Sequence, residues 1–393
     1  MSAPSLRFKA ESGKDYPSWS TKKLNALAKI YDGTHMTPEY KNSGVPFFSV
    51  EHLTSNNFKD TKFISEEVFE KENKKVKLEK GDILMTKIGD IGTAKYIDWD
   101  VRASFYVSLA LIKQSSAVNS LFLARSIASP YFQKELHQRI IHVAFPKKIN
   151  LGEIGECLVQ LPCEQEQTKI ACFLTAVDEK IARLTQKCEL LTQYKKGVMQ
   201  QIFSQQLRFK DDEGREFPKW GEAPLSRVSQ FLDGKRKPIK EGDRAKIQGK
   251  YPYYGASGIN DYVNDYIFDE EIILLGEDGE NIVSRNLPLA FKVTGKCWVN
   301  NHAHVIKPNE FTNIDFLAQY LENISYLEYN TGTAQPKLNQ EICKKIPVPT
   351  PSFEEQTKIA NYLTAIDDKI NSAQAHIAAV KYYKQGLLQQ MFV

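Results

Sequence analysis

Gly249-Lys250 carries the glycine and lysine of a phosphate-binding loop, but the next residue does not fit one. Tyr251 stands where such a loop needs Ser or Thr to hold magnesium. Gly89 and Gly92 lack the third glycine of a dinucleotide-binding loop. The segment 286–289, Asn-Leu-Pro-Leu, differs from the Asn/Asp-Pro-Pro-aromatic motif of an amino-methyltransferase. We therefore predict that the chain has no catalytic residues.

Two histidines and two acidic residues are the remaining candidates for a metal or acid–base site. His302 and His304 share one face if they lie on a strand, because strand side chains alternate. No carboxylate or cysteine lies near them in the sequence to complete a metal site. Glu277 and Asp278 have no partner base that can be named, so a loop at a strand end is the better interpretation. The six cysteines form no Cys-x-x-Cys pair, which favours reduced core thiols. We predict no bound metal.

Other polar clusters suit contact with DNA. Residues 235–240, Lys-Arg-Lys-Pro-Ile-Lys, form a basic, turn-rich segment, for which phosphate contact and a solvated loop are equally good interpretations. Residues 298–302, Trp-Val-Asn-Asn-His, place two amides and an imidazole together on an exposed turn or strand. Asparagine can pair with adenine, and histidine can donate to guanine or to phosphate. This segment is therefore a candidate for reading bases.

The first half of the chain offers a matching slot. Aligning Ile112-Lys113 with Ile306-Lys307 places residues 106–108, Tyr-Val-Ser, opposite residues 300–302. Residues 144–150 and 332–339 form a second matched pair of loops, each with lysine beside a small or amide residue. Different polar residues in matched slots are what two readers of different sequences need. The predicted DNA-binding residues are Lys87, Arg102, Tyr106, Ser108, Lys147, Lys148, Lys235, Arg236, Lys237, Tyr254, Ser257, Asn300, Asn301, His302, Gln335 and Lys337.

The chain is a tandem repeat. The segment Leu6-Arg-Phe-Lys9 returns at 207–210, and Pro17 and Trp19 return as Pro218 and Trp220. Glu166-Gln-Thr-Lys-Ile-Ala171 returns at 355–360. The stretches between these matches share little. We therefore predict four segments in the order variable, constant, variable, constant, with bounds 1–160, 161–206, 207–352 and 353–393.

The constant segments are predicted to be long helices. In each, apolar residues recur with the alternating spacing of four and three that is typical of a coiled-coil seam. Two such stripes need a partner, and an approximate two-fold between the halves predicts that the helices pair antiparallel. Each seam has one polar slot, Lys195 or Lys384; it either fixes the register or marks a helix that loosens before Gly197 or Gly386. The seam residues are Ile170, Leu174, Val177, Ile181, Leu184, Leu191, Ile359, Leu363, Ile366, Ile370, Ile377 and Val380.

The variable segments are predicted to be mixed α/β, of the α+β class. Strands are expected at 81–85, 107–112, 271–275 and 297–305, and helices at 314–329 and at 121–140, the latter broken at Pro130. The predicted architecture is thus two globular α+β domains joined by two long antiparallel helices, in a pseudo-two-fold tandem repeat.

Composition and charge limit the class of protein. The chain has 393 residues with 42% hydrophobic and 25% charged residues, which is typical of folded domains. A formal net charge of +4 excludes a polycation that coats DNA without regard to sequence. No apolar run is long enough for a membrane span, and the first residues do not form a signal peptide. We expect a cytoplasmic protein.

The repeated motifs resemble those of specificity subunits of type I restriction-modification systems. The resemblance rests on Leu-Arg-Phe-Lys with Pro-x-Trp, on Glu-Gln-x-Lys-Ile-Ala opening a helix that ends in Lys-x-Gly-x-x-Gln-Gln-x-Phe, and on three segments of the second variable part. These are residues 253–258, 276–279 and 300–304. It covers nearly the whole chain. The first variable part lacks the Asn-Asn-His and Gly-Glu-Asp-Gly runs, so its reading residues are less well defined.

The resemblance implies a bipartite reader of double-stranded DNA. The segments 1–160 and 207–352 would be two target recognition domains, each reading one half-site. The two helices would hold them apart and bind two methyltransferase subunits, which restriction and motor subunits join. The resemblance also implies that this chain binds no cofactor, with S-adenosylmethionine, ATP and magnesium belonging to partner subunits.

Two alternatives remain from the sequence. The chain could be an orphan DNA-binding or anti-restriction protein that uses the same frame alone, in which case it would not co-purify with a methyltransferase. It could also be a self-sufficient restriction nuclease, in which case the purified chain would cut DNA with magnesium. The motif search disfavours the nuclease.

Overall fold

The computed structural model describes residues 4–332 and 335–392, which fall into two compact units. The first unit combines Met1–Leu184 with His376–Val393, and the second is Thr185–Ala375. Each unit therefore contains one variable segment together with part of each constant helix. The predicted four-segment division follows the sequence repeat, whereas compactness divides the chain within the two helices.

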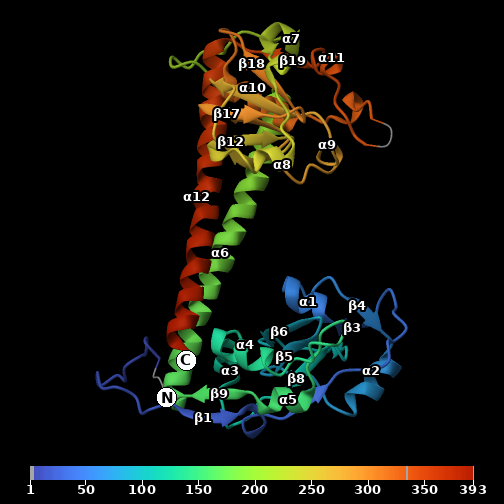
Figure 1. The fold of residues 1–393 in the computed structure, drawn as a ribbon, viewed down its shortest axis with the longest axis vertical. Helices are drawn as coiled ribbons and strands as arrows, with labels where there is room; N and C mark the ends of the chain where they lie inside the picture. The colour runs from blue at the N-terminus through green and yellow to red at the C-terminus, as the bar shows by residue number, and fades with distance from the viewer. Residues whose placement is uncertain (1–3, 333–334, 393) are drawn as a thin grey trace. The chain divides into compact units, whose positions relative to one another are not determined.

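The first unit is built on two small sheets. A four-stranded antiparallel sheet has the order β2-β8-β5-β6, and a three-stranded sheet has the order β4-β3-β7 with β3 and β7 parallel. Short helices cover them (Figure 1). The strands are β2 (Ile30–Asp32), β3 (Val45–Phe48), β4 (Lys62–Ile64), β5 (Ile83–Ile88), β6 (Asp90–Tyr96), β7 (Ser104–Phe105) and β8 (Leu109–Ile112). The helices are η1 (Leu24–Ala26), α1 (Val50–Ser55), α2 (Glu66–Asn73), α3 (Ser120–Ile127), α4 (Pro130–His137) and α5 (Leu151–Glu156).

The second unit repeats this topology although the sequences differ. Its sheets have the orders β11-β18-β15-β16 and β13-β12-β17-β14, and β12 and β17 are parallel as β3 and β7 are. The strands are β11 (Ser229–Phe231), β12 (Gln248–Gly255), β13 (Gly258–Val263), β14 (Phe268–Asp269), β15 (Ile272–Gly276), β16 (Ala290–Val293), β17 (Lys296–Val299) and β18 (Ala303–Pro308). The helices are α7 (Leu225–Val228), η2 (Asp233–Lys235), α8 (Glu241–Arg244), α9 (Asn281–Ser284), α10 (Ile314–Asn323), η3 (Leu327–Tyr329) and α11 (Gln340–Cys343).

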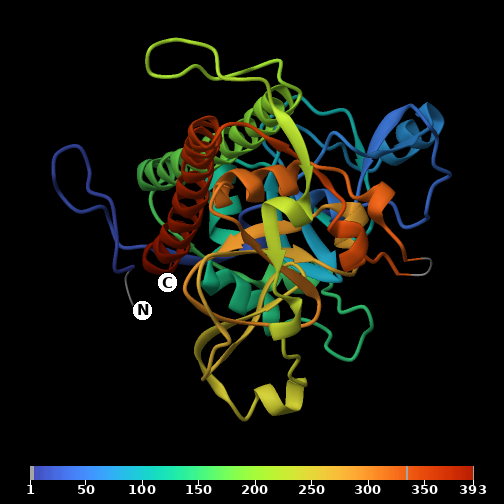
Figure 2. The same ribbon diagram turned by 90° about the horizontal axis from the view of Figure 1, so that it is seen from above.

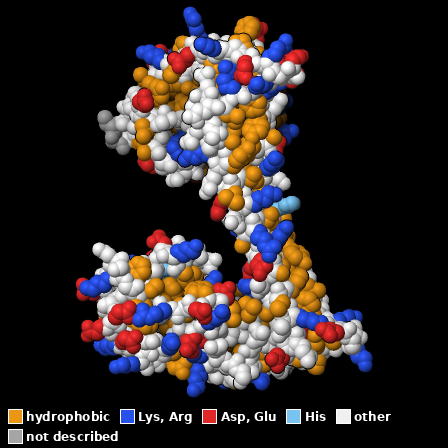
Figure 3. Space-filling view, turned by 180° about the vertical axis from the view of Figure 1, so that it is seen from behind, with side chains coloured by type: hydrophobic (Ala, Val, Ile, Leu, Met, Phe, Trp, Pro, Cys, Tyr) orange, Lys and Arg blue, Asp and Glu red, His pale blue; other side chains and the backbone are white. Residues whose placement is uncertain are grey.

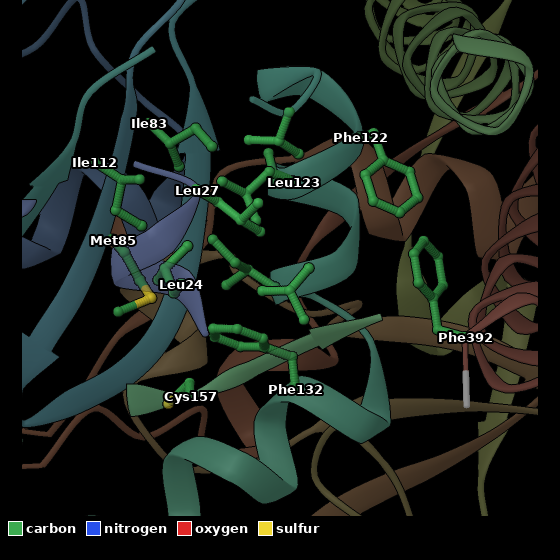
Figure 4. Close-up of a cluster of buried hydrophobic side chains, with 14 of the residues drawn as sticks. Leu24, Leu27, Ile83, Met85, Ile112, Phe122, Leu123, Phe132, Cys157 and Phe392 are labelled. Atoms are coloured by element: carbon green, nitrogen blue, oxygen red, sulfur yellow. The ribbon is translucent and has the colours of Figure 1, made fainter. Parts of the chain in front are cut away.

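The central strands β5 and β15 are apolar runs because both faces of the sheet are covered. In β15, Ile273 and Leu275 enter one core cluster, and Ile272 and Leu274 enter the other. Such burial on both faces removes the usual polar alternation of a strand. In the first unit, Ile83 and Met85 of β5 likewise face the cluster that contains Phe122 and Phe132 (Figure 4).

The mixed α/β prediction is confirmed, with three local corrections. The helix predicted at 314–329 ends at Asn323, and the short helix η3 follows at Leu327–Tyr329. The strand predicted at 297–305 is two strands, β17 and β18, separated by a turn at residues 300–302. The strand predicted at 107–112 begins only at Leu109. The break at Pro130 is confirmed: Ser129 caps α4 by accepting a hydrogen bond from the amide of Phe132, and Pro130 occupies the first turn, where its missing N–H costs nothing.

The constant helices are α6 (Glu164–Phe203) and α12 (Phe353–Met391), and the predicted antiparallel pairing is confirmed within each unit. In the first unit, Ile170 and Leu174 near the start of α6 pack in one cluster with Met391 at the end of α12. In the second, Ile202 near the end of α6 packs with Ile359 near the start of α12. All twelve predicted seam residues are buried or half-buried.

The lysine at the polar position of each seam forms an ion pair. In the second unit, Nζ of Lys195 lies 2.7 Å from Asp367, and in the first, Nζ of Lys384 lies 2.7 Å from Asp178. Both helices continue through Gly197 and Gly386, so loosening is not the explanation. Each lysine thus meets an aspartate of the opposite helix, which supports the role of a register marker.

Each unit ties its constant helix to its variable segment through a buried carboxylate. Glu166 is fully buried and accepts hydrogen bonds from Arg7 at 2.7 Å and from Nε1 of Trp19 at 3.0 Å. Glu355 does the same with Arg208 at 2.7 Å and Trp220 at 2.8 Å. This contact explains why the repeated Leu-Arg-Phe-Lys, Pro-x-Trp and Glu-Gln motifs recur together. We call each set a carboxylate clamp.

Two further features flank each clamp. The arginine-bearing segment forms a hairpin loop closed by the bridge Lys9–Asp15 in the first unit and Lys210–Glu216 in the second, and the second loop stands out from its unit in Figure 2. A two-stranded sheet then leads into each constant helix. These sheets pair β1 (Ser20–Lys23) with β9 (Leu158–Leu161) and β10 (Gly221–Pro224) with β19 (Pro347–Thr350).

Glu166→Gln and Glu355→Gln should each destabilise only the unit that contains the substitution. The change leaves a half-buried arginine without its counter-charge, for which we expect a loss of about 2 kcal/mol, reduced from the value for a fully buried pair because the arginine is partly hydrated. Hydrogen exchange followed by mass spectrometry would show faster exchange in one unit and unchanged exchange in the other. Equal effects in both units would contradict the local role of the clamp.

Candidate nucleic-acid interface

Three chain segments meet at the end of strand β5 in the first unit. The amide of Lys87 donates to the carbonyl of Ser108 at 2.9 Å, which joins the strand to the β7–β8 turn. The amide of Gly89 donates to the carbonyl of Lys147 at 2.8 Å, and a bridge pairs Ile88 with Lys148. We call this meeting of the turn at 106–108, the turn at 88–90 and the loop at 144–150 the first three-loop edge.

The second unit has the same arrangement at the end of β15. The amide of Glu277 donates to the carbonyl of His302 at 2.8 Å, and that of Gly279 donates to Pro336 at 3.1 Å. A bridge pairs Asp278 with Lys337. We call the turns at 300–302 and 277–279 with the loop at 335–339 the second three-loop edge. Residues 333–334 of the loop predicted at 332–339 lie outside the described residues.

The registers of the sheets confirm the predicted alignment of the two edges. Ile83 of β5 pairs with Ile112, and Ile273 of β15 pairs with Ile306, so 106–108 and 300–302 occupy one slot. The turn that follows each strand has a glycine with positive φ in the same place, 81° at Gly89 and 103° at Gly279. The two edges therefore have the same backbone arrangement but carry different polar side chains.

The hairpin between β12 and β13 also reaches the second edge. Tyr254 accepts a hydrogen bond at its carbonyl from the amide of Asn300 at 3.1 Å. The adjacent turn passes so close to β15 that a Cβ added to Gly276 would lie 2.7 Å from the carbonyl oxygen of Ala256. Tyr254 and Ser257, both half-buried, are thus next to the 300–302 turn, as their prediction as site residues requires.

The three polar residues of the 300–302 turn divide into one that shapes the turn and two that face solvent. Asn300 is 5% exposed, and its side-chain oxygen accepts the amide of His302 at 2.8 Å. Its side-chain oxygen therefore holds the turn, and contact of Asn300 with a base stays a prediction. Asn301 and His302 are exposed. Nδ1 of His302 lies 2.8 Å from a carboxylate oxygen of Asp278.

A charged cluster lies beneath the second edge. Asp233 accepts hydrogen bonds from Nδ1 of His304 at 2.6 Å and from Gln340 at 2.8 Å. Arg236 reaches Glu277 at 2.7 Å and the carbonyl of Ala303 at 2.8 Å. Burial alone would lower the pKa of His304, but the hydrogen bond to Asp233 raises this pKa to about 10. Both ring nitrogens of His304 also face oxygen acceptors, Asp233 and the carbonyl of Leu338, as a protonated imidazole requires.

The pKa of Asp233 shows the same balance. Burial would raise it, yet the hydrogen bond from His304 leaves the pKa of Asp233 below its ordinary value.

Asp233, Glu277 and His304 come close enough together to hold a metal ion. Arg236 and Lys337 already supply positive charge to the carboxylates, at 2.7 Å and 3.4 Å from Glu277. Neither carboxylate is near His304 in sequence, so sequence reasoning missed this cluster; the absence of a metal stays a prediction.

In the first unit, a different cation pairs with the corresponding aspartate. Asp32 occupies the position of Asp233 in the repeat, and Lys87 reaches it at 2.8 Å with a side chain only 9% exposed. Ala110 stands where the second unit has His304, as the paired strands show. In both units a cation therefore pairs with the aspartate of the repeated Asp-Gly. The cation is Lys87 of β5 in the first unit and His304 of β18 in the second.

Internal ion pairs engage two of the predicted DNA contacts. The charged groups of Lys87 and Arg236 are half-buried or buried and bind carboxylates inside the fold. Asn300 is buried as well, and contact of these three residues with DNA stays a prediction. Arg102 lies away from the edge, where it pairs with Glu66 of α2 and stacks on Phe69.

The other predicted site residues keep positions that suit contact with a ligand. Lys147, Lys148, Lys237, Gln335 and Lys337 are exposed, and Lys235 is 60% exposed with its nearest carboxylate at 3.9 Å. Tyr106 and Ser108 are half-buried on the first edge, where the hydroxyl of Tyr106 lies 3.1 Å from that of Thr37. Their contact with DNA stays a prediction.

Sequence reasoning did not single out two exposed features of the edges. Phe145 on the loop of the first edge and Val143 just before this loop are 102% and 96% exposed, a few residues ahead of the two lysines. Asp278 was assigned only to a loop at a strand end, because nothing in the sequence places it beside His302. The apolar residues next to Lys147-Lys148 were a visible signal, whereas the Asp278–His302 pair needed the fold.

The six cysteines are free, and three of them are buried. Cys157, Cys297 and Cys343 are buried, and burial raises the pKa of the Cys157 and Cys297 thiols to about 12. The prediction of core thiols is wrong for Cys172, which is exposed on α6. No helix within the described ranges has an apolar stretch long enough to cross a membrane.

A sheet frame that occurs twice, each time joined by a carboxylate clamp to a long constant helix, defines a tandem protein with two equivalent variable edges. The family model described as the type I restriction modification DNA specificity domain matches residues 17–193 and 219–382. The chain belongs to this family of specificity subunits.

Relatives agree with this assignment, and a solved structure shares the fold. A putative type I restriction enzyme specificity subunit of Haemophilus influenzae is 37% identical over 143 residues, which is 36% of each chain. The putative MjaX specificity subunit of Methanocaldococcus jannaschii is 24% identical over 97% of this chain and 94% of its own. The fold is similar to that of the type I restriction-modification S subunit from M. genitalium, with a TM-score of 0.64 and 16% identity over 100% and 99% of the two chains.

Lys235→Ala and Arg236→Ala should separate phosphate contact from structure. Loss of Lys235 should weaken binding to all DNA sequences and lower the salt slope by about 1. Loss of Arg236 should instead lower the free energy of unfolding by about 3 kcal/mol, because it leaves Glu277 and Asp233 buried with less counter-charge. Salt-dependent binding and chemical denaturation of both variants would test this. The assignment fails if Arg236→Ala is as stable as the wild type.

Proposed function

We propose that each three-loop edge reads one half of a bipartite site in double-stranded DNA and that the chain directs partner subunits to this site. The observation that carries the proposal is the pair of edges: one backbone arrangement, fixed by the same hydrogen bonds, presents different polar side chains in the two units. A structural loop has no reason to keep its backbone and change its donors and acceptors. A reader of two different half-sites needs this combination.

The two kinds of exposed residue suit the two kinds of contact with DNA. Asn301 and His302 offer hydrogen-bonding groups on a turn that strands β17 and β18 hold. Amides and imidazoles of this kind read base edges in the major groove. The exposed lysines flank the edges at 147–148, 235, 237 and 337, where they would bind phosphate and set the register.

We infer that the chain itself performs no catalysis. Methylation and cleavage would be carried out by partner subunits, which would also bind S-adenosylmethionine, ATP and magnesium. The cytoplasm is the proposed location, because the DNA and the partners are there and the six free cysteines suit a reducing compartment.

Exposed aromatic residues on the long helices are the proposed contacts for the methyltransferase. Tyr194 of α6 and Tyr383 of α12 occupy the same position in the repeat and are 52% and 55% exposed. Leu190 and Tyr382 add exposed area beside them, at 57% and 77%. Hydrophobic side chains are visible at the surface of the helices in Figure 3. Large exposed aromatic side chains are typical anchors of protein interfaces, and their repetition supports two methyltransferases per chain.

Asn301→Ala should lower discrimination at the half-site read by the second unit and leave the other half-site unchanged. A good contact to a base edge contributes about 1–3 kcal/mol of discrimination. Competition binding of the assembled complex against DNA with single substitutions in each half-site would measure this. A loss spread evenly over both half-sites, or a loss of protein stability alone, would contradict the proposed reading role.

Tyr194→Glu and Tyr383→Glu should each reduce the number of bound methyltransferases from two to one, because each places a charge in one of the two proposed contacts. Light scattering of the co-expressed complexes gives the stoichiometry. Leu287→Glu is a matched control, since Leu287 is 56% exposed but lies in the variable part of the second unit. A complex of unchanged stoichiometry in both tyrosine variants would place the docking surface elsewhere.

A further inference from the structure

The Asp278–His302 pair lies on the second three-loop edge, and its geometry decides which atom of the imidazole faces outward. Nδ1 of His302 lies 2.8 and 3.0 Å from the two carboxylate oxygens of Asp278. An ionised carboxylate has no hydrogen to give and can only accept. Nδ1 therefore carries a hydrogen. In the neutral imidazole Nε2 then has none and accepts hydrogen bonds, whereas in the imidazolium Nε2 donates.

Backbone contacts fix both members of the pair. The amide of His302 donates to the side chain of Asn300, and its carbonyl accepts from Glu277, both at 2.8 Å. Asp278 lies between Glu277, which also accepts from Leu338 at 2.7 Å, and Gly279. With the backbone fixed on both sides, the orientation of the imidazole depends on its contact with Asp278.

The Nε2 side of the ring is available to a ligand. The side chain of His302 is 50% exposed, and Nε2 makes no hydrogen bond with any residue in the described ranges. His304 shows the contrast: it is buried, and both of its ring nitrogens are engaged, by Asp233 and by the carbonyl of Leu338. Only the first histidine of the His-x-His pair can therefore meet a base.

We propose that Asp278 is a positioning residue for base readout, and that His302, as the neutral imidazole with its hydrogen on Nδ1, reads an exocyclic amino group, of adenine or of cytosine, through Nε2. This inference rests on the proposed function and adds the chemical class of the base. In the major groove, adenine N6 and cytosine N4 are the donors, whereas guanine presents acceptors at N7 and O6. It replaces the expectation that the histidine donates to guanine or to phosphate.

The first unit lacks this device and serves as an internal reference. The positions of Asp278 and His302 correspond to Ile88 and Ser108, which have no carboxylate or imidazole. The half-site read by the first unit should therefore be unaffected by any change to the pair. Asp269, an exposed carboxylate of the same unit that lies 4.0 Å from Lys296, provides a matched control for loss of charge.

The experiment uses the assembled complex and the DNA site identified by methylation mapping. Asp278→Ala and His302→Ala should each reduce discrimination at the same base pair by about tenfold, and the double variant should lose no more than either single one. His302→Gln places a polar atom near the position of Nε2 and should retain part of the discrimination, with or without Asp278. His302→Asn reaches only the position of Nδ1 and should not.

A purely electrostatic role of Asp278 gives a different result. Removing a negative charge beside DNA strengthens binding to every sequence, and Asp269→Ala should show that behaviour alone. If Asp278→Ala matches Asp269→Ala while His302→Ala still loses discrimination, the positioning role is wrong and the proposed function stands. If His302→Ala changes neither half-site, the proposed reading edge itself fails.

Base analogues identify the partner atom. Replacing the target adenine by purine, or the target cytosine by 2-pyrimidinone, removes the amino group. That replacement should weaken binding of the wild type about tenfold and leave His302→Ala unaffected. If 7-deazaguanine weakens the wild type instead, and removal of the amino groups does not, the ring donates and the assignment of Nε2 as acceptor is overturned.

Discussion

The carboxylate clamp is the contact on which each unit depends, because it joins three segments that are remote in the sequence. Glu166 and Glu355 have no exposed surface, so each must find its counter-charge and hydrogen-bond donors within its own unit. Arginine and tryptophan supply them from the segment before the sheets, and the glutamate supplies the acceptor from the first turns of the constant helix. The variable segment is thereby held at both ends, and its sheets can differ in sequence without losing their attachment.

Most of the frame could be predicted from the sequence because periodicity and repetition are local signals. The seam of α6 and α12 followed from spacing alone, and its antiparallel sense followed from the repeat. The role of Lys195 and Lys384 did not, since an ion pair to Asp178 or Asp367 depends on which residues of the opposite helix face the slot. The sequence left residues 298–302 as an exposed turn or strand, because Asn300 bends the chain through a side-chain hydrogen bond that strand propensity does not report.

The site was harder to predict than the frame, for a physical reason. Exposure and pairing of a charged residue depend on distant segments, so a basic run alone does not show which lysine or arginine is free. Within residues 235–237, Arg236 is held by Glu277 and the other two are exposed, although the three are adjacent and alike in charge. The alignment of residues 106–108 with residues 300–302 succeeded because it used strand register, which the repeat supplies. It needed no knowledge of individual side chains.

The two units also show what limits variation at an edge. Both keep the aspartate of the repeated Asp-Gly, 29% exposed as Asp32 and 7% exposed as Asp233, and a carboxylate that is largely removed from water requires a cation. The first unit provides it from β5 as Lys87, and the second provides it from β18 as His304, with Arg236 bound to Glu277 in the place of the lysine. Replacing only one of these residues would leave a buried charge unmatched. The side chains that face solvent can change singly to read another base, whereas those beneath them must change in charge-balanced sets.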